Sequence, residues 1–121
     1  PRASGRLEGS LFAACARGPT TVSNCVARVD TRTGAVATWA GDAGAGEELL
    51  GEPAIVEADG AVEPGDPSDV LLVSAHGRHG PSLVVLDAQE MQEVVRCRLP
   101  ADGPQAPIAV PYSLHGEWLP A

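Results

Sequence analysis

The sequence predicts an all-β protein made of short antiparallel strands with little helix. Apolar runs of strand length recur along the 121 residues, and turn residues separate them, with 14 glycines and 11 prolines in the chain. No segment has the apolar periodicity of an amphipathic helix, whereas several have the composition of β-strands. The spacing of strand, turn and strand suits a sandwich, a barrel or propeller blades equally well, so periodicity leaves the architecture open.

Three strands are predicted in the first third of the chain, over 10–16, 24–30 and 35–39. Residues 1–9 are expected to be irregular, because "PRASGR" has the composition of a linker. A Gly-Pro-Thr-Thr connection joins the first two strands, and a polar turn from Asp30 to Gly34 joins the next two. Gly34 suits the positive φ that such a turn requires.

The strongest strand signals lie in the second half of the chain. Strands are predicted over 52–58, 70–76, 82–88, 93–99 and, as a short closing strand, 112–118, with loops over 41–51 and 59–69. Pro53 fits the first position of its strand, because proline donates no hydrogen bond to a sheet. The segment from Asp87 to Met91 is expected to make a helical turn. Arg96 and Arg98 alternate with apolar neighbours, which indicates one wet face in that strand.

The charge of the chain excludes some classes of partner. Its formal net charge is −8, from 8 Lys and Arg against 16 Asp and Glu. This argues against a nucleic-acid partner, because phosphate binding depends on clustered cations, and it does not favour anionic lipid. No apolar run reaches the ~18 residues that a membrane-spanning helix needs.

Cysteines and histidines outside the final segment do not suggest a metal site. Cys15, Cys25 and Cys97 are widely spaced and form no Cys-x-x-Cys pair, so buried free thiols are expected. A Cys15–Cys25 bridge across the first hairpin is left open. His76 and His79 lie in a predicted hairpin turn, where no helix brings both onto one face, and are interpreted as exposed turn residues.

Four segments follow one another in an order and spacing that resemble the carotenoid cleavage oxygenase family. They are "RVDTRTGAVATW", "GEPAIV", "DVLLVSAHGRHGPSLVVLDAQEMQEVVRCRLP" and "VPYSLHGEWLPA". They are similar to the family's strand-turn-strand with a Thr-Gly turn, its Glu-Pro strand opening, its paired strands with a Leu-Asp-Ala turn, and its closing segment around a His-Gly pair. No single segment is specific, but together they cover roughly residues 24–121.

The resemblance implies that residues 1–121 are the C-terminal portion of a seven-bladed β-propeller with Fe(II) on its axis, held by four histidines. It implies a non-haem dioxygenase that uses O2 to cleave a carbon–carbon double bond of a carotenoid or apocarotenoid. His115 matches one iron ligand, and Glu52 matches a glutamate that accepts a hydrogen bond from the outer nitrogen of another ligand. Neutral imidazoles suit ferrous iron, and a carboxylate behind a ligating imidazole fixes its tautomer. No catalytic residue beyond the metal site is implied.

Departures from the family pattern limit these expectations. Ser113 stands where the family usually has glycine, and the other three histidine ligands do not occur in this sequence. We therefore expect the intact protein to be the enzyme and this chain alone to be inactive. The alternative is a non-catalytic propeller piece that serves binding or scaffolding, since a fold does not guarantee an activity. The expected localisation is a plastid or the cytoplasm, with any peripheral membrane contact made by parts of the protein outside this sequence.

Overall fold

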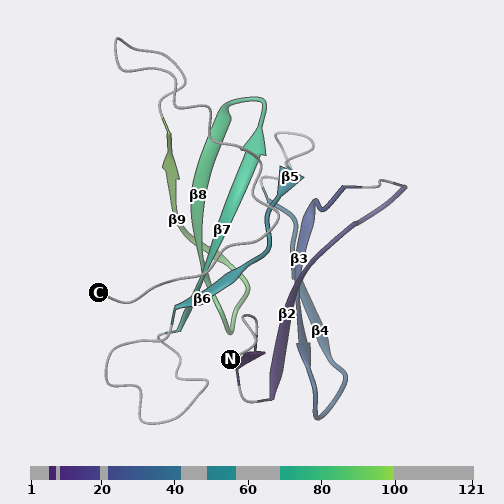
Figure 1. Cartoon of the computed structure of the whole chain (residues 1–121). Helices are drawn as coiled ribbons and strands as arrows, with labels where there is room; N and C mark the ends of the chain where they lie inside the picture. Colours follow the sequence, from purple (N-terminus) through teal and green to yellow (C-terminus); the bar gives the residue numbers. More distant parts are fainter. Residues whose placement is uncertain (1–5, 8, 20–21, 42–48, 57–68, 100–121) are drawn as a thin grey trace.

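The computed structural model describes residues 6–7, 9–19, 22–41, 49–56 and 69–99, which form nine strands in two antiparallel sheets (Figure 1). Sheet 1 contains β1 (Arg6–Leu7), β2 (Ser10–Cys15), β3 (Cys25–Asp30) and β4 (Val36–Trp39). Sheet 2 contains β5 (Leu49–Leu50), β6 (Ala54–Val56), β7 (Val70–Gly77), β8 (Gly80–Asp87) and β9 (Glu93–Arg98). None of the described residues forms a helix that could cross a membrane.

Each sheet is an antiparallel meander. In sheet 1 every strand pairs with the next one along the chain, and sheet 2 follows the same order, except that β5 and β6 both pair with β7. Segments β5 and β6 therefore act together as one interrupted first strand, followed by β7, β8 and β9. Two consecutive four-strand meanders are the arrangement expected of neighbouring propeller blades.

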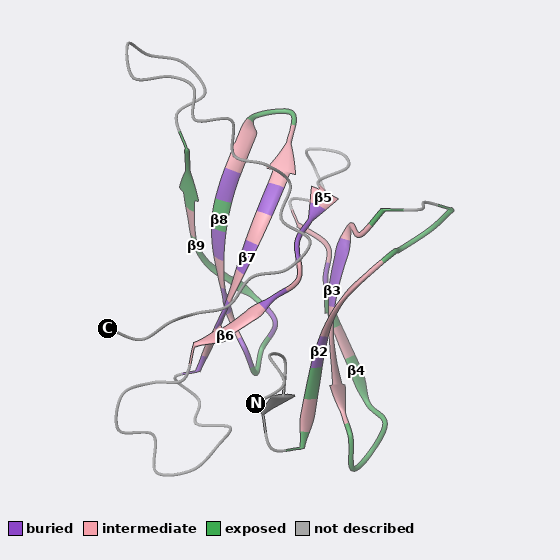
Figure 2. Ribbon diagram, in the orientation of Figure 1, coloured by how far each residue is buried: buried purple, intermediate pink, exposed green. Residues whose placement is uncertain are grey.

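A single hydrophobic core fills the space between the two sheets, shown in purple along the strands in Figure 2. Alternate residues of β7 and β8 face it, because Leu71 lies opposite Leu86 and Val73 opposite Val84, and all four are fully buried. Sheet 1 contributes chiefly Phe12, Val26 and Trp39, and the remaining buried members are Leu50, Ala75, Ala88 and Met91. Truncating a core leucine of this kind typically costs about 2–5 kcal/mol, so this core holds the two sheets together.

The same turn joins the third and fourth strands of each sheet. Asp30 Oδ1 accepts hydrogen bonds from the backbone of Thr33 at 2.8 Å and of Arg32 at 2.9 Å. Asp87 Oδ1 accepts the equivalent bonds from the next turn at 2.7 and 2.8 Å. Each turn closes with an N–H four residues beyond its aspartate that donates to the aspartate carbonyl, at 2.8 Å in the first and 3.0 Å in the second. The closing residues, Gly34 and Met91, have φ of 74° and 53°.

Most of the strands predicted from the sequence are confirmed, as is the helical turn after Asp87, which stops after one turn. Two expectations are wrong. Arg6–Leu7 forms β1 inside the segment expected to be irregular, and Leu49–Leu50 forms β5 inside a predicted loop. Both are two-residue strands that exist only through pairing with a neighbour, and local composition does not record that pairing. The predicted closing strand over 112–118 lies outside the described residues.

Candidate functional site

Glu52 lies in a bulge that interrupts the first strand of sheet 2. In the pairing with β7, Leu50 lies opposite Ala75 and Ala54 lies opposite Leu72. From Leu50 to Ala54 the first strand of sheet 2 advances four residues, whereas β7 advances only three between Leu72 and Ala75. The segment between β5 and β6 therefore contains one extra residue. A β-bulge of this kind bends the strand and changes the direction of the side chains it carries, and bulges are common next to active sites.

The backbone on both sides of Glu52 is held in place. Gly51 and Pro53 are buried, whereas Glu52 between them is half-buried. The Gly51 N–H donates to the Ser74 carbonyl at 2.9 Å, and the Leu50 N–H donates to the Ser23 carbonyl next to sheet 1 at 2.8 Å. The Glu52 side chain therefore stands on a fixed backbone and is only partly buried.

The two residues predicted for the iron site have different outcomes. Glu52 is placed as just described, whereas His115 lies outside the described residues. Within the described ranges, no three side chains of His, Cys, Asp or Glu lie together as a metal ligand set. Glu52 is a half-buried carboxylate on a rigid backbone, a kind of group that can accept the ring N–H of an imidazole.

The interpretation of the two central histidines is half right. His79 is exposed in the turn between β7 and β8, as expected. His76 is not a turn residue: it belongs to β7, lies opposite Pro81 and Leu49, and its Nε2 atom is buried. The hairpin is tighter than predicted, because pairing continues to Gly77 and Gly80.

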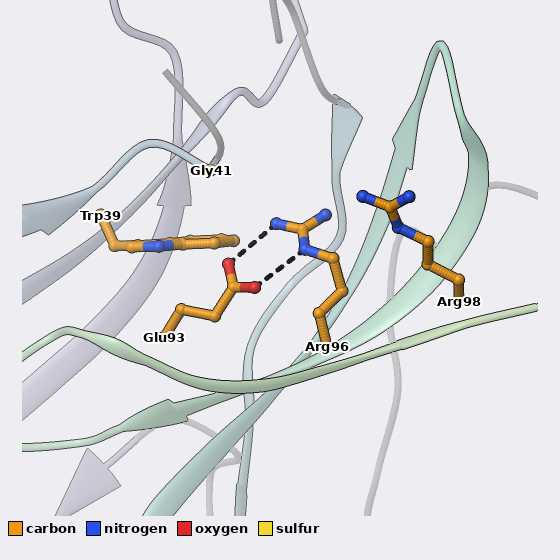
Figure 3. Close-up of a pocket in the computed structure, with 5 residues that line it drawn as sticks. All are labelled: Trp39, Gly41, Glu93, Arg96 and Arg98. Carbon is orange, nitrogen blue, oxygen red and sulfur yellow. Dashed lines mark hydrogen bonds and ion pairs between the residues drawn. The ribbon is translucent and has the colours of Figure 1, made fainter. Parts of the chain in front are cut away.

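A second concave feature lies between the last strands of the two sheets. This rim cavity has a volume of about 700 Å³ and is lined by Trp39 from the end of β4, by Gly41, and by Glu93, Arg96 and Arg98 from β9 (Figure 3). Glu93 holds Arg96 in a two-point ion pair, with its carboxylate oxygens 2.9 Å from Nε and 2.9 Å from Nη2. Arg96 Nη1 also donates to the Ser82 hydroxyl at 3.3 Å.

The alternation of arginine and apolar residues in β9 was predicted from the sequence, but this cavity was not. Arg96 lies opposite the buried Val84 and Arg98 opposite the buried Ser82, so the arginine face of β9 turns toward sheet 1. The apolar face is not covered by the described residues, since Val95 is 47% exposed. The cavity depends on β4 and β9 lying on the same side of the core, which residue spacing alone does not reveal.

Cys15 and Cys25 lie directly opposite each other on β2 and β3, and both are free thiols, so the bridge left open by the sequence is not formed. Burial raises the pKa of the Cys25 thiol to about 11, and a hydrogen bond shared with the Cys15 thiol acts in the same direction. Burial and a shared hydrogen bond both favour the neutral thiol, so Cys25 is a poor nucleophile at neutral pH.

Comparison with known sequences gives consistent matches. The family model described as retinal pigment epithelial membrane protein (RPE65) matches residues 1–120. Two proteins of Oryza sativa subsp. japonica are similar to the chain: carotenoid cleavage dioxygenase 8 homolog A, chloroplastic, at 29% identity over 121 residues, and homolog B, chloroplastic, at 30% over 120 residues. The alignments cover 100% and 99% of this chain but 20% and 19% of the relatives. The chain thus spans about a fifth of the length of the curated relatives it matches.

A solved structure has the same fold. The crystal structure of an ACO/RPE65 chimera superposes with a TM-score of 0.75 at 23% identity, covering 96% of this chain and 23% of the chimera. At 23% identity, this similarity is evidence for the fold alone. It confirms the all-β prediction and matches the two meanders to part of a β-propeller.

Proposed function

Because the chain belongs to the RPE65 family of carotenoid oxygenases, we propose that it is part of a non-haem iron(II) dioxygenase that cleaves a carbon–carbon double bond of a carotenoid or apocarotenoid. The relatives named as carotenoid cleavage dioxygenases support this reaction class and its use of O2. The iron is what the family resemblance implies. The proposal concerns the full-length enzyme, since this chain corresponds to about a fifth of those relatives.

In this proposal two residues of the chain serve the iron. His115 holds it through one imidazole nitrogen, and the iron when bound supplies the chemistry that lets O2 react with the double bond. Glu52 accepts the outer ring N–H of another ligating imidazole. A proton held at that outer nitrogen leaves the inner nitrogen free to bind metal and fixes the plane of the ring.

The observation that carries the proposal is the bulge at Glu52. The glutamate that the family resemblance assigns to the iron site stands where the first strand of sheet 2 is interrupted and its backbone is anchored by Gly51. An ordinary strand glutamate on a solvated face needs no such interruption. The non-catalytic alternative, a binding or scaffold piece, gains no specific support from the described residues.

Substitution of His115 tests the proposal. In the full-length enzyme, His115→Ala is expected to abolish carotenoid cleavage and to lower bound iron well below one per protein, because a lost ligand opens the metal to water. Cleavage would be followed by product chromatography and iron by elemental analysis. His79→Ala, which changes an exposed turn residue, serves as the control and is expected to match the wild type. Normal turnover in His115→Ala with iron retained would remove the assignment.

A further inference from the structure

The rim cavity is separate from the position of Glu52. Glu52 belongs to the first strand of sheet 2, whereas Arg96 and Arg98 belong to β9, its last strand. The three strand spacings between β6 and β9 place them about 14 Å apart across the sheet. The cavity therefore lies apart from Glu52, and its described lining residues include neither residue of the proposed iron site.

The cavity is positive in a strongly negative chain. The net charge of the whole sequence is −8 and it holds only 8 cationic Lys and Arg side chains, two of which line this cavity. Glu93 neutralises one of these charges through its two-point pair with Arg96. Arg98 is exposed, and its side chain makes no hydrogen bond or ion pair with the described residues. The described side chains that line the cavity therefore carry one net positive charge, located at Arg98.

Arg96 is held in place by its neighbours, and Arg98 extends from the same face of β9. The Arg96 side chain is only 13% exposed and is held by Glu93 and by the nearly buried Ser82. Arg98 follows two residues later, so its side chain leaves the same face of β9, and Figure 3 shows both guanidinium groups extending to the same side. A guanidinium presents two parallel N–H donors, which match the two oxygens of a carboxylate.

Trp39 supplies an apolar wall. Its ring lies beside the Glu93–Arg96 pair in Figure 3, and the side chain is 9% exposed, so its position is fixed by the core. A planar apolar group can pack on an indole face, and the cavity volume of about 700 Å³ falls within the range of small-molecule sites. The apolar wall favours a ligand that joins a planar apolar body to its anionic group, which inorganic phosphate lacks.

From these contacts we propose that the rim cavity binds a small monoanionic carboxylate with a planar apolar body. The carboxylate pairs with the Arg98 guanidinium, and the planar group packs against Trp39. The Glu93–Arg96 pair keeps the cavity wall in place and sets its net charge.

Titration of the chain with benzoate, followed by ¹H–¹⁵N correlation spectra, tests the proposal. Benzoate is expected to shift the Trp39 indole N–H and the Gly41 and Arg98 amides together, with one dissociation constant. Arg98→Gln should weaken benzoate binding at least about tenfold, since it removes a charge-assisted hydrogen-bond pair. Arg32→Gln, which removes another exposed arginine, in the β3–β4 turn, is the matched control and should leave the constant unchanged.

Three further ligands separate the contributions of the ring and of the charge to benzoate binding. Acetate lacks the ring and benzamide lacks the charge, so each is expected to bind at least about tenfold more weakly than benzoate. Inorganic phosphate at pH 7.5 should also bind more weakly. The proposal would be overturned if benzoate caused no shifts at Trp39, or if the two arginine variants had equal affinities for it. It would also be overturned if acetate or benzamide bound as tightly as benzoate, or if phosphate bound more tightly.

Discussion

The ionisation of Cys25 shows how burial, more than any neighbouring charge, sets the chemistry of one side chain. The residue is 2% exposed, and burial is the first cause of its raised pKa of about 11, followed by the hydrogen bond with Cys15. Arg17 acts in the opposite direction but does not outweigh burial. The sequence predicted buried free thiols, which is right for Cys25 but wrong for Cys97, which is exposed, and Cys15 is half-buried. It did not reveal that Cys15 and Cys25 lie opposite each other, because strand register is not a local property.

This pKa predicts a stability change at alkaline pH. The folded-state pKa of Cys25 lies above the ordinary thiol value of 9.0, so the folded chain holds the thiol proton more tightly than the unfolded chain. The stabilisation is therefore complete below pH 9 and is lost as the pH rises to about 11. Thermal midpoints measured from pH 8 to 11 should fall more steeply for the wild type than for Cys25→Ala. Parallel curves for the two proteins would contradict the assignment.

At the scale of elements, the repeated turn explains how each sheet passes from its third to its fourth strand. Asp30 and Asp87 play the same part in the two turns. The sequence predicted both turns, as a polar turn from Asp30 to Gly34 and a helical turn from Asp87 to Met91. It did not predict that Met91 occupies the left-handed position, since a buried methionine side chain held by the core can offset an unfavourable φ.

Gly34→Ala tests the requirement for positive φ. Gly34 has a φ of 74°, and an added Cβ would meet no atom within 4 Å, so any loss of stability comes from the backbone alone. We expect a loss of about 1 kcal/mol, from the unfavourable left-handed conformation less the reduced freedom of the unfolded chain. Urea unfolding measures this, and Gly34→Asn, which tolerates the conformation, should lose less. An alanine variant as stable as the wild type would show that the turn relaxes.

Element boundaries could be predicted only in part from the sequence. The long strands β7 and β8 have clear apolar patterns and were placed to within about two residues, but the Glu-Pro segment was expected to form one strand from residue 52. In the structure, regular pairing resumes only at Ala54, after the bulge. The bulge arises from the mismatch of two pairings with β7, which are contacts between distant segments that no local pattern records.

At the scale of the whole molecule, the two sheets form one unit around a shared core, and Arg28 of β3 adds a hydrogen bond to the Gln89 carbonyl in the β8–β9 turn. Family membership and the resemblance in fold place this unit in a propeller. The Glu52 bulge lies in the first strand of sheet 2 and the rim cavity lies at its last strand, so a variant in one is not expected to alter the other. This independence allows the proposed iron-site role of Glu52 to be tested without disturbing the rim cavity.

The most direct test of the central claim is the iron content and turnover of Glu52→Gln in the full-length enzyme. If Glu52 orients a ligating imidazole, the amide weakens the charge-assisted hydrogen bond, and iron affinity or carotenoid cleavage should fall about 10–100-fold. The thermal midpoint of the iron-free protein should remain within about 1 °C of the wild type, because the shape of the side chain is preserved and surface changes of this kind cost little. Glu90→Gln, at an exposed turn position, should alter neither iron nor turnover. If Glu52→Gln and Glu90→Gln both retain wild-type iron and turnover, Glu52 is only a strand residue and the account of the bulge is wrong.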